Sequence, residues 1–228
     1  MSDHPTAALL FAAGLGTRMA PLTNDRPKPL IRVAGKALLD HAIAQFDGQT
    51  IVVNAHYFHG QIEDHLRGTS VLISDERNTL LETGGGLKHA IPLLGQAPVF
   101  TMNTDAVWAG PSPVKAIAAQ WDPGKMEALL LLVPMQAAVG HKGGGDFDLL
   151  QDGRIVRGSS YVYSGLQIIK TDGLATIDDT AFSMWALWSG MFDRSAVYGL
   201  VYTGRWCDVG QPESIRIAEE MLKGCPDV

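Results

Sequence analysis

The sequence predicts an α/β protein with a doubly wound, mostly parallel (Rossmann-like) sheet and a small antiparallel portion. Short apolar runs at residues 6–12, 49–54 and 71–73 alternate with two segments of helical periodicity, a rhythm typical of parallel strands joined by helices. After Thr6 the first run is wholly apolar, and glycines follow it closely, as expected of a strand buried on both faces. At 228 residues, the whole chain is expected to form a single domain.

The other elements follow from periodicity and turn residues. Asp152-Gly153 predicts a hairpin turn before residues 154–156, and this hairpin supplies the antiparallel portion. The apolar spacing of residues 184–192 favours a core helix, with stacking of its tryptophans on a ligand as the alternative. Further strands are expected at 98–105, 127–134 and 197–203, and helices at 36–46, 59–66, 111–120, 212–222 and after the glycines of 84–86, the last ended by Pro92.

Composition excludes several classes of function. A formal net charge of −6 disfavours nonspecific nucleic-acid binding, which needs a basic surface, and no terminal run reads as a signal peptide or membrane span. Two cysteines, Cys207 and Cys225, predict no disulfide framework and fit the cytoplasm, with Cys207 packed as a small apolar residue. His56, His59 and His65 lack the spacing of a helical metal-ligand pair and are interpreted as surface or loop residues.

Residues 12–30, Ala-Ala-Gly-Leu-Gly-Thr-Arg-Met-Ala-Pro-Leu-Thr-Asn-Asp-Arg-Pro-Lys-Pro-Leu, predict an anion-binding loop. Gly14 and Gly16 can bring bare backbone N–H groups close to an anion. Arg18 offers a planar fork of donors that suits phosphate oxygens, and Lys28 offers a compact charge between two stiffening prolines. Because open α/β folds bind ligands at the carboxyl ends of their strands, we expect a phosphate site there.

Two better-known phosphate motifs do not fit these residues. A dinucleotide-binding fingerprint needs a third glycine where Met19 stands and a helix where Pro21 stands. A Walker loop needs a Gly-Lys-Ser/Thr sequence that this stretch does not contain. The remaining alternative is an ordinary surface loop with chance basic residues. This alternative is weaker than an anion-binding loop, because the glycines, the basic residues and the prolines occur together in one stretch.

The combination resembles the signature of the sugar-1-phosphate nucleotidyltransferases, which join a nucleoside triphosphate to a sugar 1-phosphate and release pyrophosphate. The likeness runs from residue 6 to about residue 222. It implies a nucleotidyltransferase (GT-A-like) fold with a nucleotide-binding half at about 1–110 and a sugar-binding half at about 111–228. It also implies that Arg18 holds the triphosphate and that Lys28 contacts the reacting phosphates. The implied nucleotide contacts are Ala12, Ala13, Gly14, Gly16, Thr17, Glu82, Gly85 and Asn103.

Two aspartates are the metal ligands that the resemblance implies. Asp105 ends the strand expected at 98–105, and Asp208 lies in Trp-Cys-Asp-Val-Gly before the last helix. Mg²⁺ is usually held by one or two carboxylates together with phosphates, so we expect both aspartates to converge on one Mg²⁺ beside the N-terminal loop. A lone Asp at a strand end is otherwise often a turn former.

Two further stretches resemble one branch of this family, the bacterial N-acetylmuramate 1-phosphate uridylyltransferases. They are Glu-Thr-Gly-Gly-Gly at 82–86 and Gly-Asp-Phe at 145–147. The branch implies UTP and N-acetylmuramate 1-phosphate as substrates, with Asp146 on sugar hydroxyls and Gly165 allowing close approach of the backbone. The lactyl carboxylate of this sugar needs a positive partner, and the sequence does not rank the candidates His141, Lys142, Arg157 and Arg205.

Some departures from the family pattern leave other functions open. Ala20, Thr104 and Ala138 replace residues that are commonly Arg, Gly and Asn in relatives. A mannose-1-phosphate guanylyltransferase is one alternative, because the Glu82 carboxylate can accept a hydrogen bond from the ring N–H of uracil or of guanine. A catalytically silent sugar-nucleotide-binding regulatory protein is another. In every case the expected partners are small molecules, and the protein is a monomer or a small homo-oligomer.

Overall fold

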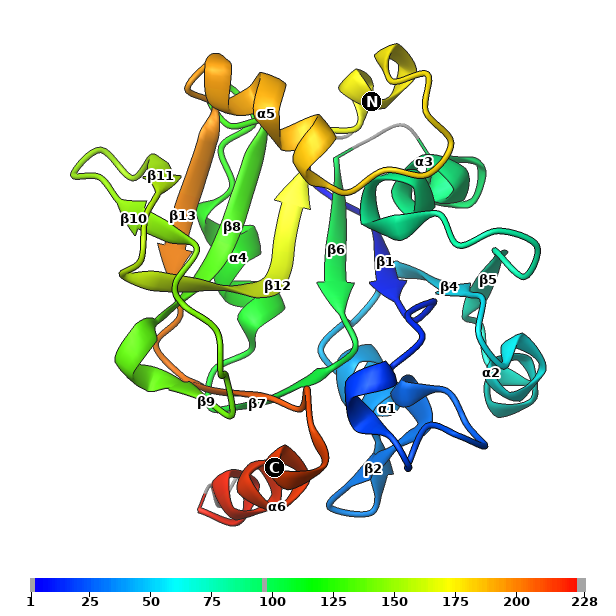
Figure 1. Cartoon of the computed structure of the whole chain (residues 1–228). Helices are drawn as coiled ribbons and strands as arrows, with labels where there is room; N and C mark the ends of the chain where they lie inside the picture. The colour runs from blue at the N-terminus through cyan, green and yellow to red at the C-terminus, as the bar shows by residue number, and fades with distance from the viewer. Residues whose placement is uncertain (1–2, 96–97, 225–228) are drawn as a thin grey trace.

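The computed structural model describes residues 3–95 and 98–224 and is organised around a nine-stranded sheet (Figure 1). Its strands are β1 (Ala7–Phe11), β4 (Thr50–Ala55), β5 (Leu72–Asp75), β6 (Val99–Asn103), β8 (Ala128–Pro134), β10 (Phe147–Leu149), β11 (Ile155–Arg157), β12 (Tyr161–Ile169) and β13 (Val197–Val201). Strands β5, β4, β1 and β6 are parallel neighbours. Strand β12 is antiparallel to β6 and β8, and β10 pairs with the hairpin strand β11. The predicted α/β class, with a parallel sheet and an antiparallel portion, is confirmed.

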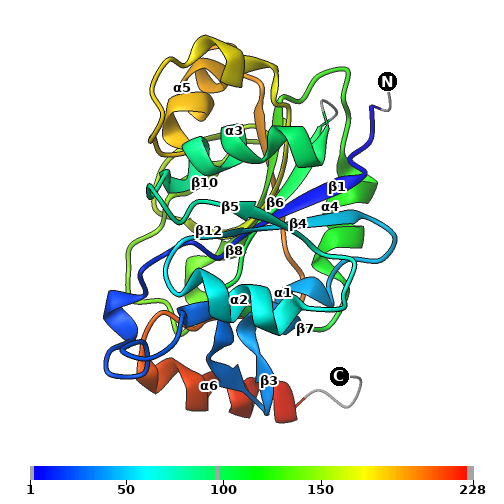
Figure 2. The same cartoon turned by 90° about the vertical axis from the view of Figure 1, so that its right-hand side faces the viewer.

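Helices cover both faces of this sheet, as Figure 2 shows. Leu10 of β1 packs into one core with Leu39 and Ile62, whereas its neighbour Leu9 packs into the opposite core with Leu87. The first strand is therefore buried on both faces, as its apolar sequence predicts. The first face carries α1 (Leu38–Ile43), α2 (His59–Leu66) and α4 (Pro113–Gln120), and the second carries α3 (Glu82–Leu94) and α5 (Trp185–Asp193).

A smaller sheet joins two strands from the middle of the chain to one strand near the C-terminal helix. It has the order β7 (Ala106–Ala109), β14 (Arg205–Asp208) and β9 (Ala138–Val139). The C-terminal helix α6 (Pro212–Lys223) packs against it around a third core that includes Val107 and Cys207. Cys207 is fully buried, and burial raises the pKa of its thiol to about 12, so it packs as a small apolar residue as predicted. Cys225 lies outside the described residues.

The helix expected at 36–46 is shorter than predicted. Its first residues instead form a two-stranded ribbon of β2 (Arg32–Val33) and β3 (Lys36–Ala37), closed by Ala34 and Gly35 with φ of 52° and 80°. The helical periodicity did not reveal this turn because Ala34, unlike Gly35, is not a residue type that usually adopts a positive φ.

The glycines of 84–86 were expected before a helix, and this prediction is wrong. They lie within the first turns of α3, which also continues past Pro92 to Leu94. The N–H groups of Gly84 and Gly85 donate to the Phe182 carbonyl oxygen at 2.9 and 3.0 Å. A Cβ on Gly84 would lie 2.5 Å from the Phe182 ring. These two glycines therefore serve the close approach of the 180–183 segment to the helix.

Two short 3₁₀ helices, η1 (Thr17–Met19) and η2 (Lys28–Leu30), belong to the N-terminal loop, and two more follow at η3 (Met135–Ala137) and η4 (Asp172–Thr176). Within residues 3–95 and 98–224, no helix combines the length and apolar character needed to cross a membrane.

Candidate active site

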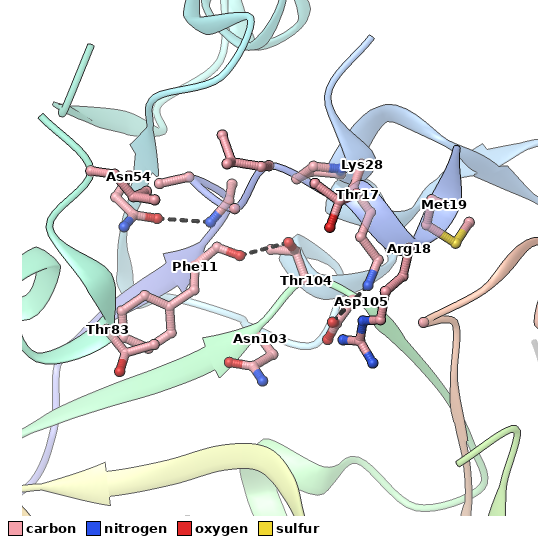
Figure 3. Close-up of a pocket in the computed structure, with 18 of the residues that line it drawn as sticks. Phe11, Thr17, Arg18, Met19, Lys28, Asn54, Thr83, Asn103, Thr104 and Asp105 are labelled. Atoms are coloured by element: carbon pink, nitrogen blue, oxygen red, sulfur yellow. Dashed lines mark hydrogen bonds and ion pairs between the residues drawn. The ribbon is translucent and has the colours of Figure 1, made fainter. Parts of the chain in front are cut away.

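A cavity of about 480 Å³ opens at the carboxyl ends of β1 and β6, which are neighbouring parallel strands (Figure 3). This is the edge at which a parallel sheet is expected to bind ligands. The sequence-predicted residues that line it are Ala12, Ala13, Gly14, Gly16, Thr17, Arg18, Lys28, Glu82, Asn103 and Asp105. The structure therefore brings together the N-terminal loop, the start of α3 and the end of β6.

The glycine-rich loop folds tightly against the segment that carries Lys28. Gly16 has φ of 64°, and a Cβ at this position would lie 2.9 Å from the Lys28 Cβ. The Thr23 hydroxyl donates to the Gly16 carbonyl oxygen at 3.0 Å. Gly16 is required here both for its left-handed backbone and for this close approach.

A buried polar pair holds the start of the loop. Asn54 accepts a hydrogen bond from the Ala12 N–H at 2.7 Å, and its amide donates to Glu76 Oε1 at 2.8 Å. Burial raises the pKa of Glu76, which is only 3% exposed. The sequence analysis missed this pair, although Asn54 is a polar residue near the end of a predicted strand, a position where the sheet edge meets the site.

Thr104 ties the two central strands together at the cavity. Its hydroxyl donates to the Phe11 carbonyl oxygen at 2.7 Å, and the residue is 3% exposed. The departure from glycine at this position therefore supplies a bond between the ends of β1 and β6.

Asp105 and Asp208 are brought together by the smaller sheet. Asp208 pairs in register with Ala106, and the Val209 N–H donates to the Asp105 carbonyl oxygen at 2.8 Å. Burial raises the pKa of Asp208, the negative charge of Asp105 raises it further, and the charges of Lys28, His141 and Arg18 oppose this. Two carboxylates and the cations Arg18 and Lys28 are thus close enough to interact, although only Asp105, Arg18 and Lys28 line the cavity and Asp208 does not.

Lys28 and His141 each lie beside one of these carboxylates. Lys28 Nζ lies 2.8 Å from Asp105 Oδ2, and His141 Nδ1 lies 3.6 Å from Asp208 Oδ2. In the described part of the chain, no group of three or more His, Cys, Asp or Glu residues is placed to hold a metal ion. The donor set is a pair of carboxylates, of which Asp208 has a pKa raised by burial and by the charge of Asp105, and it fits a hard divalent cation whose other ligands come from phosphates or water.

A second cavity of about 300 Å³ adjoins the first, and the two share Phe11, Thr83 and Asn103 in their walls. Asp146 lines it and accepts a hydrogen bond from the Tyr163 N–H on Oδ2 at 2.8 Å. Trp188 packs in the core as predicted, donates to Gln167 Oε1 at 2.9 Å and lines this cavity as well. The cavity also contains Arg157 and Trp185.

Two predicted site residues lie beside the cavities. Gly165 is buried beneath Asn103 with φ of 88°, and a Cβ there would lie 2.8 Å from the Asn103 Cβ. Gly85 does not line the 480 Å³ cavity. It lies under the Thr180 carbonyl oxygen and borders a separate cavity with Glu76 and Lys88.

The sequence of the chain matches a family of nucleotide-binding transferases, in agreement with the geometry of the site. A family model described as the MobA-like NTP transferase domain matches residues 8–139, which is more than half of the chain. The chain belongs to the MobA-like NTP transferase family. This membership confirms the resemblance to nucleotidyltransferases that the N-terminal loop indicates.

Two curated relatives of this NTP transferase carry the name N-acetylmuramate alpha-1-phosphate uridylyltransferase. The protein from Caulobacter vibrioides is 43% identical over 97% of this chain and 99% of its own length. The protein from Neisseria meningitidis is 34% identical over 89% of this chain and 92% of its own. A solved UDP-glucose pyrophosphorylase in complex with UDP-glucose is 16% identical, with a TM-score of 0.76 over 95% of this chain and 97% of that one. The last likeness concerns the fold alone and confirms the nucleotidyltransferase (GT-A-like) fold.

Proposed function

We propose that this nucleotidyltransferase transfers a uridylyl group from UTP to N-acetylmuramate 1-phosphate, giving the UDP-sugar and pyrophosphate. The observation that carries the proposal is the pair of adjoining cavities, one with a glycine-rich loop, Arg18 and Lys28, the other with Asp146 and aromatic walls. The names of the two relatives that match over most of this chain support the choice of substrates.

In the proposed reaction, an oxygen of the sugar 1-phosphate attacks the α-phosphorus of UTP in line. The new bond joins that oxygen to the α-phosphorus, and the bond from the α-phosphorus to the departing pyrophosphate breaks. Arg18 stabilises the charge that gathers on the pyrophosphate, while Lys28 stabilises the attacking and attacked phosphates together. No protein nucleophile or base is required, because the sugar phosphate is already ionised at neutral pH, so catalysis rests on positioning and electrostatics.

Asp105 and Asp208 are the residues proposed to hold Mg²⁺. Burial and the charge of Asp105 raise the pKa of Asp208, and a divalent cation bound between the two carboxylates would offset the cost of that charge. When bound, Mg²⁺ supplies polarisation of the α-phosphate and orients it.

The base is proposed to lie between the N-terminal loop and the start of α3, where Glu82 and Thr83 form part of the wall. Glu82 can accept from the ring N–H of uracil. A cytoplasmic location follows from the proposed triphosphate substrate and agrees with the unpaired, buried thiol of Cys207.

Pyrophosphate release from a panel of triphosphates and sugar 1-phosphates tests the proposal. The wild-type protein with Mg²⁺ should show its highest kcat/KM for UTP with N-acetylmuramate 1-phosphate. Preferred turnover of GTP with mannose 1-phosphate would replace it with the guanylyltransferase alternative. Nucleotide binding without turnover of any pair would replace it with the regulatory alternative.

A further inference from the structure

We propose that Arg157 selects the sugar substrate by binding the lactyl carboxylate of N-acetylmuramate 1-phosphate. The inference rests on the proposed function, because it requires a sugar 1-phosphate in the second cavity. Arg157 is the only basic side chain among the described residues that line this cavity. A sugar bearing a carboxylate therefore meets one cationic partner there, while an analogue without that carboxylate, such as N-acetylglucosamine 1-phosphate, gains nothing from it.

The other basic candidates in this half of the chain have different surroundings. Lys142 Nζ donates to Gln211 Oε1. Arg205 donates to the Met221 carbonyl oxygen at 2.8 Å, near the end of α6. His141 lies beside Asp208 and contacts the Gly144 carbonyl oxygen at 3.1 Å. None of these three side chains lines the second cavity.

The two cations of the first cavity are also committed elsewhere. Arg18 and Lys28 line the nucleotide cavity, where the proposed reaction requires them on phosphates. An anionic group on the sugar ring lies away from the 1-phosphate, so it needs a separate cation. Only Arg157, among the described lining residues, meets that requirement.

The geometry of Arg157 suits a carboxylate. Its guanidinium carbon lies 3.7 Å from the centroid of the Trp185 ring, so the aromatic face of α5 holds the group by a cation–π contact. Within the described residues, the guanidinium makes no hydrogen bond or ion pair of its own. A stacked guanidinium keeps its in-plane N–H donors available for the paired, bidentate contact that carboxylates favour.

Asp146, which immediately precedes β10, supplies the complementary chemistry. Phe147, the residue after Asp146, pairs in register with Arg157, and the side chains of both Asp146 and Arg157 line the same cavity. One oxygen of Asp146 accepts from the Tyr163 N–H, which leaves its other oxygen for a sugar hydroxyl. The cavity thus offers an acceptor for a hydroxyl and a cation for a carboxylate.

The test compares two sugars that differ in the lactyl group. Arg157→Gln should raise the KM for N-acetylmuramate 1-phosphate and lower its kcat/KM by roughly 10–100-fold, as expected for loss of a charge-assisted contact. The kcat/KM for N-acetylglucosamine 1-phosphate should stay within about threefold of wild type. Arg157→Lys should recover part of the loss, because it keeps the charge but not the bidentate fork.

Arg154→Gln is the matched control. Arg154 lies on the same hairpin but forms an ion pair with Asp152 at 2.6 Å and does not line the cavity. This variant should leave both sugars unaffected. Equal losses on both sugars in Arg157→Gln, or no loss on N-acetylmuramate 1-phosphate, would overturn the assignment.

If the proposed function itself is wrong, the result differs from the outcomes that would overturn the role of Arg157. In that case the wild-type protein itself would not turn over N-acetylmuramate 1-phosphate. Calorimetric binding of the two sugar phosphates then decides the role of Arg157. A preference for the carboxylate-bearing sugar that disappears in Arg157→Gln would support it, and equal binding of both sugars by wild type would overturn it.

Discussion

Lys28 and Asp105 form an ion pair at the nucleotide cavity, with 2.8 Å between Nζ and Oδ2 (Figure 3). Their side chains are 12% and 33% exposed, so water screens the pair only in part. In the proposed reaction each has another partner, since Lys28 binds phosphates and Asp105 holds Mg²⁺. Binding of the substrates therefore requires this pair to separate, and the lysine competes with a cation for the same carboxylate.

We predict that Lys28→Met strengthens Mg²⁺ binding in the absence of nucleotide while it lowers turnover by about a hundredfold or more. The substitution removes the competing ammonium but also the charge that stabilises the reacting phosphates. Calorimetry measures the first effect, and pyrophosphate release measures the second. Asp105→Asn is the control and should lose both metal binding and turnover. Unchanged metal affinity in Lys28→Met, or turnover near that of wild type, contradicts the prediction.

We predict that Asp208→Asn stabilises the fold but abolishes most turnover. Burial and the charge of Asp105 both raise the pKa of Asp208, so removing its charge relieves a cost in the metal-free protein. The expected gain in Tm is a few degrees, at roughly 2–4 °C per kcal/mol for a domain of this size, with a loss of about a hundredfold or more in kcat. Thermal denaturation without metal and pyrophosphate release with Mg²⁺ measure the two effects. The exposed Asp178→Asn should change neither, and a turnover near wild type in Asp208→Asn would remove this residue from the proposed site.

The pH dependence of the protein's stability should reveal the raised pKa of Glu76. Burial raises the pKa of this carboxyl above its usual value of 4.5, so the folded state binds more protons than the unfolded state as pH rises past that value. Stability must therefore fall with increasing pH across this window. Glu76→Gln keeps an acceptor for the Asn54 amide and removes the titration. The Tm of the variant relative to wild type should thus increase as the pH rises above 4.5.

The control for this measurement is Glu220→Gln, which alters an exposed pair with Arg216 at 2.9 Å. Such surface pairs contribute little, so its Tm relative to wild type should stay nearly constant with pH. A difference between Glu76→Gln and wild type that does not vary with pH would contradict the raised pKa of Glu76.

Much of the nucleotide cavity was predictable because its residues follow strands in the sequence. The carboxyl ends of parallel strands meet at one edge, so the loop after β1 and Asp105 after β6 had to lie close together. Asp208 was carried over from the family signature alone. Its approach to Asp105 depends on the pairing of β14 with β7, which local periodicity does not encode.

Other features depend on contacts between distant segments. The glycines of 84–86 looked like a loop signal, yet they are helical because the 180–183 segment packs against them. Asn54 of β4 and Glu76, which follows β5, form a pair that no local pattern indicates. Arg157 could be named as a candidate from its charge, but its place beside Trp185 became visible only in the folded chain.

The bend of β12 at Gly165 gives the last prediction. The pairing of β12 with β8 shifts register between Tyr163 and Gln167, and Gly165 occupies this shift with φ of 88°. A Cβ there would lie 2.8–2.9 Å from side-chain atoms of Asn103, which lines both cavities. Gly165→Ala should therefore lower stability by more than the roughly 1–2 kcal/mol of backbone strain alone and raise the KM for both substrates by displacing Asn103.

Gly68→Ala separates the effect of backbone strain from the effect of displacing Asn103. Gly68 has a similar φ of 83°, but a Cβ there meets nothing within 4 Å, so this variant carries the backbone cost without the clash. Chemical denaturation and steady-state kinetics of the two variants make the comparison. Gly165→Ala should be the less stable of the two, and it alone should change KM. If both variants lose equal stability and keep wild-type kinetics, Asn103 tolerates the added methyl group, and Gly165 is needed only for its backbone conformation.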